Sequence, residues 1–495
     1  MFDILFTKTP LVFFVQNVWR DEAFSYLMSQ QSLLEILKTT AQDFNPPLYY
    51  LLLHYWMILF GNSEVALRSL SFVFFAGTIV LLFEIMLQVM KIPTRRALLY
   101  GILIAINPFL LSYAFEARMY MMVTFFVTLS YFALWTSRSK LYQCAILAAL
   151  YTHYFAVFIL AAQLLQKTAP GIIDSFKKKS FFTQFARKIP HFDMMAFMKT
   201  HLNFVLPIAL FLPWIIYLLM NHNFTDGGFW IIRPLLSDIL FLPFVLYTGY
   251  ERIFGEYYHG RAGYTEFHSD LNIIMWVMIL IPVFMTITEF LRRKRLIHLP
   301  FKLPISNLQS PISNLLWAFF TPISIFVISQ LTTPLYHPRY YIVAVPGLIL
   351  LLITSCEILY SLLSRSVKKS PGAARFIPYL LLLILVGFLM RETQVFNKLN
   401  LKYHSKQTVS RMYAEIMSVK QPEDQIYLTD DLDYPLALYY TGLDRVYIFN
   451  KAYDEIPAYV GKVLIPEDAS IFQYPRFPAK AYIIKYDSYL IHSEL

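Results

Sequence analysis

The chain of 495 residues is too apolar for an ordinary soluble protein. Hydrophobic residues make up 57% of it and charged residues 15%, against roughly 45–50% and 25% in soluble domains. One signal peptide or one anchor cannot produce this balance, because a single membrane span uses only about 20 residues. The composition therefore excludes a cytosolic enzyme and predicts many membrane-spanning helices.

The N-terminal residues 1–18 form a broken apolar run that contains Lys8 and Pro10. This run resembles neither a signal peptide nor a full span, so a first helix lost through a truncated or misassigned start is one expectation. Residues 16–60 are interpreted as a first outer loop with juxtamembrane helices, of which the apolar stretch 45–60 lies in the membrane interface. Two short apolar stretches, 141–150 and 155–165, predict a compact hairpin or a re-entrant segment.

Longer apolar tracts follow this loop and are separated by polar segments. Their lengths predict membrane spans. The tracts are residues 68–90, 97–112, 120–135, 204–220, 271–291, 315–331, 341–363 and 377–390. We expect residues 1–390 to form a mostly α-helical polytopic bundle of about ten to twelve spans.

The net charge of +10 has a topological explanation. Half of the 42 lysines and arginines fall in alternate loops, and short loops rich in these residues stay in the cytoplasm. These loops are residues 91–96, 138–140, 167–199, 292–302 and 365–375. The intervening loops carry acidic residues and are predicted outside, so no nucleic-acid partner is expected.

Residues 391–495 differ in character from the bundle. Residues 405–419 have helical spacing of apolar side chains, and 425–429, 445–449 and 481–484 are strand candidates. The sequence therefore predicts a small soluble α/β domain outside the membrane.

Three groups of polar residues interrupt the apolar pattern on the predicted outer side. Asp21 and Glu22 are adjacent carboxylates at a low-dielectric boundary, where like charges can raise one pKa and create a general base, or together bind a divalent cation. The alternative is that the pair only caps an interfacial helix. Glu116 and Arg118 are two residues apart, so they face separate partners or are exposed turn residues.

The third group, Arg339 and Tyr340, enters a predicted span, and Arg68 begins another. An arginine in such a place suits an anionic phosphate, because its guanidinium can hold two oxygens at once. Snorkelling to lipid phosphates is the alternative. His153, at the tip of the predicted hairpin, is a lone histidine, which is more often packed than a ligand.

Taken in order, short motifs along the chain resemble the C-type membrane glycosyltransferases, in the branch of dolichyl-phosphate-mannose protein mannosyltransferases and aminoarabinose lipid A transferases. Each motif is short, and it is their joint order that carries the resemblance. The motifs are Asp21-Glu22, Asn45-Pro46-Pro47-Leu48-Tyr49-Tyr50, His54-Tyr55-Trp56, Leu67-Arg68-Ser69, Asn107-Pro108, Glu116-Ala117-Arg118-Met119-Tyr120, Thr152-His153-Tyr154 and Arg339-Tyr340.

The resemblance implies a multi-pass plasma-membrane enzyme. It would move a hexose or pentose from a dolichyl- or undecaprenyl-type phosphate to a lipid, protein or polysaccharide acceptor, with inversion, at the extracytoplasmic face. Asp21 looks like the catalytic acid/base residue, with Glu22 as its partner and Glu116 as a second carboxylate near the acceptor or a metal. No cofactor is assigned, and a divalent metal stays an open option.

The resemblance also assigns residues to the two substrates. The donor phosphate would be held by Arg118, Arg339, Tyr340 and Arg68, while His54 and His153 are candidates for the acceptor cavity. The alternative from another class is a transporter or flippase of lipid-linked sugars, which is expected to carry inverted repeats. The sequence contains no such repeat, and the candidate residues gather at one predicted membrane face. A purely structural or receptor-like membrane protein is the third option.

Overall fold

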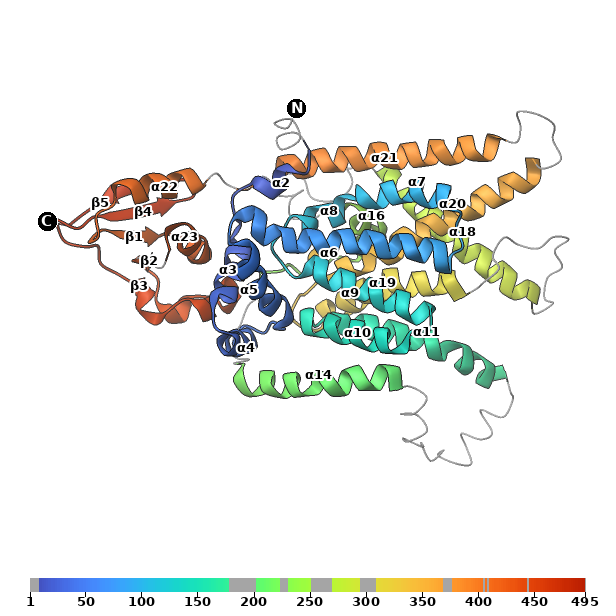
Figure 1. The fold of residues 1–495 in the computed structure, drawn as a ribbon, viewed down its shortest axis with the longest axis horizontal. Coiled ribbons are helices and arrows are strands. Elements are labelled where there is room, and N and C mark those ends of the chain that lie inside the picture. The colour runs from blue at the N-terminus through green and yellow to red at the C-terminus, as the bar shows by residue number, and fades with distance from the viewer. Residues whose placement is uncertain are drawn as a thin grey trace.

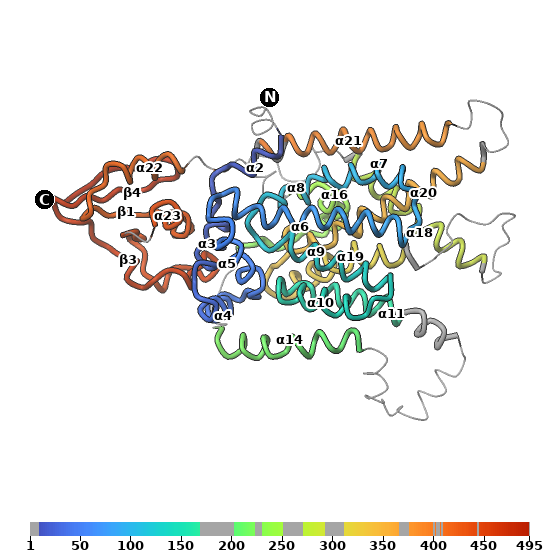
Figure 2. The backbone as a smooth tube through the Cα atoms, viewed as in Figure 1, coloured from blue at the N-terminus to red at the C-terminus, as the bar shows by residue number. Residues whose placement is uncertain are grey.

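A computed structural model describes residues 9–177, 202–222, 230–250, 269–293, 309–367, 376–403, 406, 409–442 and 445–494. The predicted basic loops at 178–199, 294–302 and 368–375 lie outside these residues. The chain forms an elongated helical bundle with a small α/β domain at one end (Figure 1). A group of short helices lies between these two parts, as the tube in Figure 2 also shows.

Six helices of the described residues are long and apolar enough to cross a membrane. They are α6 (Glu64–Glu84, continued by the π-helical turn Ile85–Val89), α14 (Leu202–Asn221), α18 (Ser269–Arg293), α19 (Gln309–Leu331), α20 (Val345–Val367) and α21 (Ile377–Tyr403). The pair α7 (Thr94–Ala105) and α8 (Pro108–Ala114) is bent by 61° and counts as a seventh span if it is one broken helix. The membrane bundle is thereby confirmed.

Three further helices do not meet the combined length and hydropathy criterion for a span, so the described residues contain six or seven candidate spans, against the ten to twelve expected for the chain. These helices are α9 (Tyr120–Trp135), α10 (Ser139–Thr152) and α11 (Ala156–Lys177). The break between α7 and α8 has a local cause, because Asn107 accepts a hydrogen bond from the Leu110 backbone N–H and Pro108 begins the new helix. The predicted hairpin at residues 141–165 is a pair of helices that turns at His153.

The predicted first outer loop consists of short helices that lie across one end of the bundle. They are α2 (Val12–Val15), α3 (Arg20–Gln30), α4 (Leu33–Gln42) and α5 (Leu48–Phe60), and two further short helices, α15 (Leu236–Leu240) and α16 (Leu242–Thr248), come later in the chain. Helix α4 begins with a capping box, in which Ser32 accepts from the Glu35 backbone N–H while the Glu35 carboxylate accepts from Ser32.

The α/β domain contains a five-stranded sheet of order β3-β2-β1-β4-β5. Strands β1 (Gln425–Leu428), β2 (Val446–Phe449), β3 (Ser470–Ile471) and β4 (Ala481–Lys485) are parallel, and β5 (Ser488–His492) is antiparallel to β4. The register places Ile426 opposite both Val446 and Tyr482. The three predicted strands are confirmed, whereas β3 and β5 were not predicted.

Helices α22 (Val409–Val419) and α23 (Tyr434–Thr441) pack with this sheet, and five 3₁₀ turns complete the domain. The turns are Asp431–Asp433, Tyr453–Glu455, Ala458–Val460, Lys462–Leu464 and Glu467–Ala469. Helix α21 runs through residues 390 and 391, where the predicted domain boundary lies, and the α/β layer begins with α22.

The centre of the bundle is closely packed around a buried tryptophan. Trp317 stacks on Tyr131 with ring centroids 3.9 Å apart, and its indole N–H donates to the Val343 carbonyl over 2.7 Å. Gly347 at the start of α20 makes this packing possible: a Cβ there would lie 2.7 Å from Trp317 Cγ and 2.8 Å from the Ala318 backbone nitrogen.

We expect Gly347→Ala to lower the stability of the folded protein by about 1–3 kcal/mol, because the added methyl group overpacks a rigid contact. The measurement is the apparent melting temperature of the purified protein in detergent. Gly387→Ala in α21 is the control, since a Cβ there meets nothing within 4 Å. Equal melting temperatures for the two variants would contradict the packing argument.

Candidate functional site

The site forms at the N-terminal end of α3, where the Asp21-Glu22 motif opens the helix. Trp19 precedes the helix in extended conformation, and its backbone N–H donates to Glu22 Oε2 over 2.9 Å. Two carboxylates in the first turn also match the positive end of the helix dipole. The local sequence therefore favours a helix start here, with both acidic side chains in the first turn.

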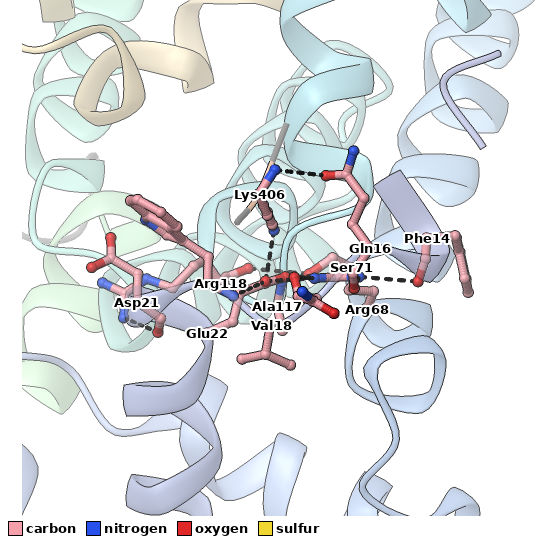
Figure 3. Close-up of polar contacts among 12 residues, drawn as sticks. Phe14, Gln16, Val18, Asp21, Glu22, Arg68, Ser71, Ala117, Arg118 and Lys406 are labelled. Atoms are coloured by element: carbon pink, nitrogen blue, oxygen red, sulfur yellow. Dashed lines mark hydrogen bonds and ion pairs between the residues drawn. The ribbon is translucent and has the colours of Figure 1, made fainter. Parts of the chain in front are cut away.

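Glu22 is a fully buried carboxylate with a complete set of partners (Figure 3). Its Oε1 accepts from Arg68 Nε at 2.7 Å and from the Ala117 backbone N–H at 3.0 Å. Its Oε2 accepts from Arg68 Nη2 at 2.7 Å and from Lys406 Nζ at 2.6 Å, in addition to the Trp19 N–H. These bonds join α3, α6, the loop before α9 and the segment that follows α21.

Arg68 is equally buried and directs its guanidinium to the protein. Nη1 donates to the carbonyls of Phe14 at 3.1 Å and Gln16 at 2.5 Å, and Nη2 donates to the Asn17 carbonyl at 2.7 Å. Every nitrogen of this guanidinium therefore has a protein acceptor. Arg68, predicted as a phosphate ligand, lies on the Glu22 side of the site and orders the segment before α3.

Charges set the protonation state of the buried pair. Burial alone would raise the pKa of Glu22, but the charges of Arg68 and Lys406 outweigh burial and hold that pKa well below its usual range. Burial conversely lowers the pKa of Lys406, although Glu22 opposes this shift. Glu22 is thus ionised at physiological pH.

Asp21 lies on the other side of the helix start and has a different environment. Its Oδ2 accepts from Arg339 Nη1 at 2.9 Å, and its side chain is 35% exposed. Arg118 Nη1 contacts the Asp21 carbonyl at 3.3 Å and Ser25 Oγ at 3.4 Å. Partial burial would raise the pKa of Asp21, but the charges of Arg118 and Arg339 outweigh it and lower this pKa.

Arg118 and Arg339 carry unused hydrogen-bonding capacity. The Nε atoms of both are buried, and within the described part of the chain they have no hydrogen-bond partner. Arg339, in the 3₁₀ segment η3 (Pro338–Ala344), lies over the rings of Trp230 at 4.9 Å and Tyr340 at 5.4 Å. Two guanidinium groups next to one carboxylate form an electropositive site that suits a phosphate.

Aromatic rings enclose this electropositive site. The His153 ring lies 6.0 Å from that of Tyr120 and 5.8 Å from that of Tyr340. His153 Nδ1 accepts from the Phe155 backbone N–H at 3.3 Å, which leaves the proton on Nε2. Burial, together with the charges of Arg118 and Arg339, lowers the pKa of His153 to about 3. The imidazole is therefore a neutral donor at physiological pH.

Two further carboxylates, Glu116 and Asp43, are close enough for the charges of the site to shift their pKa values. Glu116 is half-buried and makes no hydrogen bond to the described residues through its carboxylate; burial raises its pKa to about 7. Asp43, at the end of α4, accepts from the Asn45 side-chain amide, and burial raises its pKa to about 7 as well. Asp21 and Arg118 contribute to the shifts of both.

His54 lies apart from the cluster. Its Nδ1 hydrogen-bonds the Ser29 carbonyl at 2.8 Å. Ser29 is eight residues beyond Asp21 in α3, or roughly 12 Å along the helix axis. Among the described residues no group of three or more His, Cys, Asp and Glu side chains is arranged to hold a metal ion.

Lys406, Asp43 and Trp230 belong to the site but were not predicted from the sequence. Asp43 had a local signal, since it stands two residues before the Asn45-Pro46-Pro47 motif. Lys406 had none, because it is 384 residues away from Glu22 in a polar segment. Trp230 likewise reaches Arg339 only through the tertiary fold.

Comparison with known proteins identifies the architecture. No protein-family model and no curated protein matches the sequence. Solved structures do match, and they confirm the expected fold, a helical membrane bundle with a small C-terminal α/β domain.

Two solved structures with this fold are of ArnT from Cupriavidus metallidurans. The apo structure superposes with a TM-score of 0.57 at 14% sequence identity, over 97% of this chain and 92% of that one. The structure bound to undecaprenyl phosphate gives 0.54 and 13%, over 97% and 93%. The similarity thus extends over both the bundle and the α/β domain.

We expect Glu22→Gln to destabilise the protein by about 3–5 kcal/mol, because Arg68 and Lys406 would stay buried without their counter-charge. The apparent melting temperature in detergent measures this. Glu35→Gln is a matched control: Glu35 occupies the same third helical position in α4 but is exposed. A loss as large in Glu35→Gln as in Glu22→Gln would show that burial of the ion pairs adds nothing.

Comparison of the wild type with Glu22→Gln also gives a pH test. Because the pKa of Glu22 is lowered on folding from an ordinary 4.5, its stabilisation is complete above that value and is lost as pH falls below it. The advantage of the wild type over Glu22→Gln should shrink by about 2 kcal/mol between pH 6 and pH 3. Other titrating groups cancel in this difference, and an advantage that is independent of pH would contradict the assignment.

Proposed function

We propose that the protein is an integral-membrane glycosyltransferase that transfers a sugar from a polyprenyl phosphate to an acceptor at the extracytoplasmic face. The observation that carries the proposal is the partly exposed Asp21 carboxylate beside two guanidinium groups, whose buried Nε–H donors have no acceptor among the described residues. The ArnT-like fold supports the general kind of activity, and an ArnT structure contains undecaprenyl phosphate. The alternation of basic loops supports the orientation.

In this proposal Arg118 and Arg339 bind the donor phosphate. Transfer breaks the bond between the anomeric carbon and the phosphate oxygen, and the electron pair of that bond leaves with the phosphate. Two guanidinium groups stabilise the negative charge that develops there, most effectively where water is excluded. The Nε–H groups of both arginines provide donors that the described protein residues do not use.

Asp21 acts as the general base in this mechanism. It takes the proton of the acceptor hydroxyl or amino group while that group attacks the anomeric carbon from the side opposite the phosphate, which inverts the configuration. A phosphate bound to Arg339 would share the guanidinium that now neutralises Asp21. The pKa of Asp21 would then rise toward the range that suits a base.

The remaining site residues support these two roles. Glu22 and Arg68 hold α3 and the segment before it, and the rings of the neutral His153 and of Tyr340 lie 5.8 Å apart beside Arg339. Glu116, which titrates near neutrality, is proposed on the acceptor side. His54 has no part in the proposed mechanism, since its hydrogen bond lies at the far end of α3.

We expect Arg118→Met and Arg339→Met each to weaken binding of undecaprenyl phosphate by about 10- to 100-fold, the loss of one charge-assisted contact. Titration of the lipid into purified protein in detergent measures the affinity. Arg138→Met is the control, because Arg138 is exposed and lies over Phe132 near the opposite end of α9. Unchanged affinity in both site variants would exclude the phosphate assignment.

Asp21→Asn should lower the transfer rate by about 10²- to 10⁴-fold, the usual contribution of a general base. Binding of undecaprenyl phosphate should stay at least as tight, because a negative charge near the phosphate is removed. The assay is transfer from a panel of polyprenyl-phosphate sugars in proteoliposomes. Retained transfer in Asp21→Asn would refute the role of Asp21. If the wild type transfers no sugar and the variant loses lipid flipping, a transporter is favoured.

A further inference from the structure

The α/β domain is fastened to the first residue of the site helix. Arg20 Nε donates to Asp433 Oδ1 at 2.6 Å, and Arg20 Nη2 donates to Asp430 Oδ2 at 2.9 Å. The side chains of Arg20 and Asp433 are only 19% and 10% exposed, so solvent screens this bridge less than a surface ion pair. Arg20 immediately precedes Asp21 and is the first residue of α3.

The partners of Arg20 are themselves held in place. Asp430 and Asp433 follow strand β1, at the carboxyl edge of the parallel sheet. Asp430 Oδ1 accepts from the Leu432 backbone N–H at 3.0 Å, which orients its other oxygen. Asp431, which lies between them in the sequence, forms an ion pair within the same domain: its Oδ2 is 2.5 Å from Lys451 Nζ. Two of the three carboxylates therefore serve the contact with α3.

Uncharged contacts extend the attachment to both sides of Arg20 in the chain. The Val18 backbone N–H donates to the Tyr440 hydroxyl at 2.9 Å. The rings of Tyr26 and Tyr439 meet edge to face with centroids 4.9 Å apart. Phe24 lies so close to Gly461 that a Cβ there would be 2.7 Å from its ring. The helix start is therefore seated on the α/β domain by apolar packing as well as by charge.

We propose that Arg20 is a positioning residue, through which Asp430 and Asp433 of the α/β domain set the orientation of Asp21 toward Arg339. The first turn of a helix lacks the backbone hydrogen bonds of its interior, so external contacts decide its order. The Asp21 side chain, which is 35% exposed, accepts one hydrogen bond, from Arg339 Nη1. The consequence of this positioning for catalysis rests on the function proposed above. In an active site, a displacement of 1 Å can cost about 10²-fold in rate.

The structural arm of the test is hydrogen–deuterium exchange on the full-length protein in detergent. Arg20→Met should speed exchange of the amides in residues 20–26 by about tenfold, and Asp430→Asn combined with Asp433→Asn should do the same. Lys451→Met is the matched control, since it breaks an ion pair of the same acidic cluster that does not reach α3. Arg20→Lys, which can hold one carboxylate but not fork between two, should give an intermediate increase and covers the case in which Arg20→Met fails to fold.

The kinetic arm uses the sugar donor that the wild type accepts. Arg20→Met should lower kcat by about tenfold while the KM for the donor stays within twofold, and Arg20→Lys should recover part of the rate. Wild-type exchange rates in Arg20→Met, or equally fast exchange in Lys451→Met, would overturn the proposal, as would a raised KM at unchanged kcat. If the wild type transfers no sugar, the proposed function fails, whereas the exchange arm still decides whether the α/β domain orders α3.

Discussion

The buried carboxylate of Glu22 is the interaction on which the site depends. A charge removed from water is tolerated only if partners replace its hydration, and here Arg68, Lys406 and two backbone N–H groups do so. The partners come from four separate stretches of chain. One side-chain charge therefore forces the start of α3, the first long helix, the loop before α9 and the segment after α21 to meet.

Asp21 and Glu22 show how adjacent carboxylates acquire different properties. Successive residues of a helix point about 100° apart, so one side chain enters the protein while its neighbour faces the partly open side. Glu22 is fully buried and saturated with donors, whereas Asp21 is 35% exposed and has one ion pair. The arginines divide in the same way. All guanidinium nitrogens of Arg68 donate to protein acceptors. Arg118 and Arg339 instead each have a buried Nε–H with no acceptor among the described residues.

The sequence was sufficient for the membrane bundle, because apolar tracts of spanning length leave few alternatives, and for three strands of the α/β domain. It also placed Asp21 and Arg339 in one proposed site, and these two form an ion pair in the structure. The sequence could not distinguish the roles of residues of the same type, such as the arginines. Whether an arginine such as Arg68 meets a ligand or a carboxylate depends on which distant segments surround it, and no local pattern contains that information.

Lys406 was unpredictable for the same reason. A lysine in a polar segment after a long helix is ordinarily a solvated residue, and only the fold brings it to within 2.6 Å of Glu22. Helix caps, in contrast, make their hydrogen bonds within a few positions of the chain. Asn107 and Ser32 cap helices in this way.

The position of these partners along the chain has a consequence for biosynthesis. Glu22 and Arg20 are translated long before two of their ion-pair partners, Lys406 and Asp433, which lie 384 and 413 residues later. Domains generally fold as units while the chain grows, but the start of α3 cannot acquire its final surroundings until the α/β domain has been translated and folded. This end of the bundle is therefore completed only after the α/β domain has formed, although the first residues of α3 are translated far earlier.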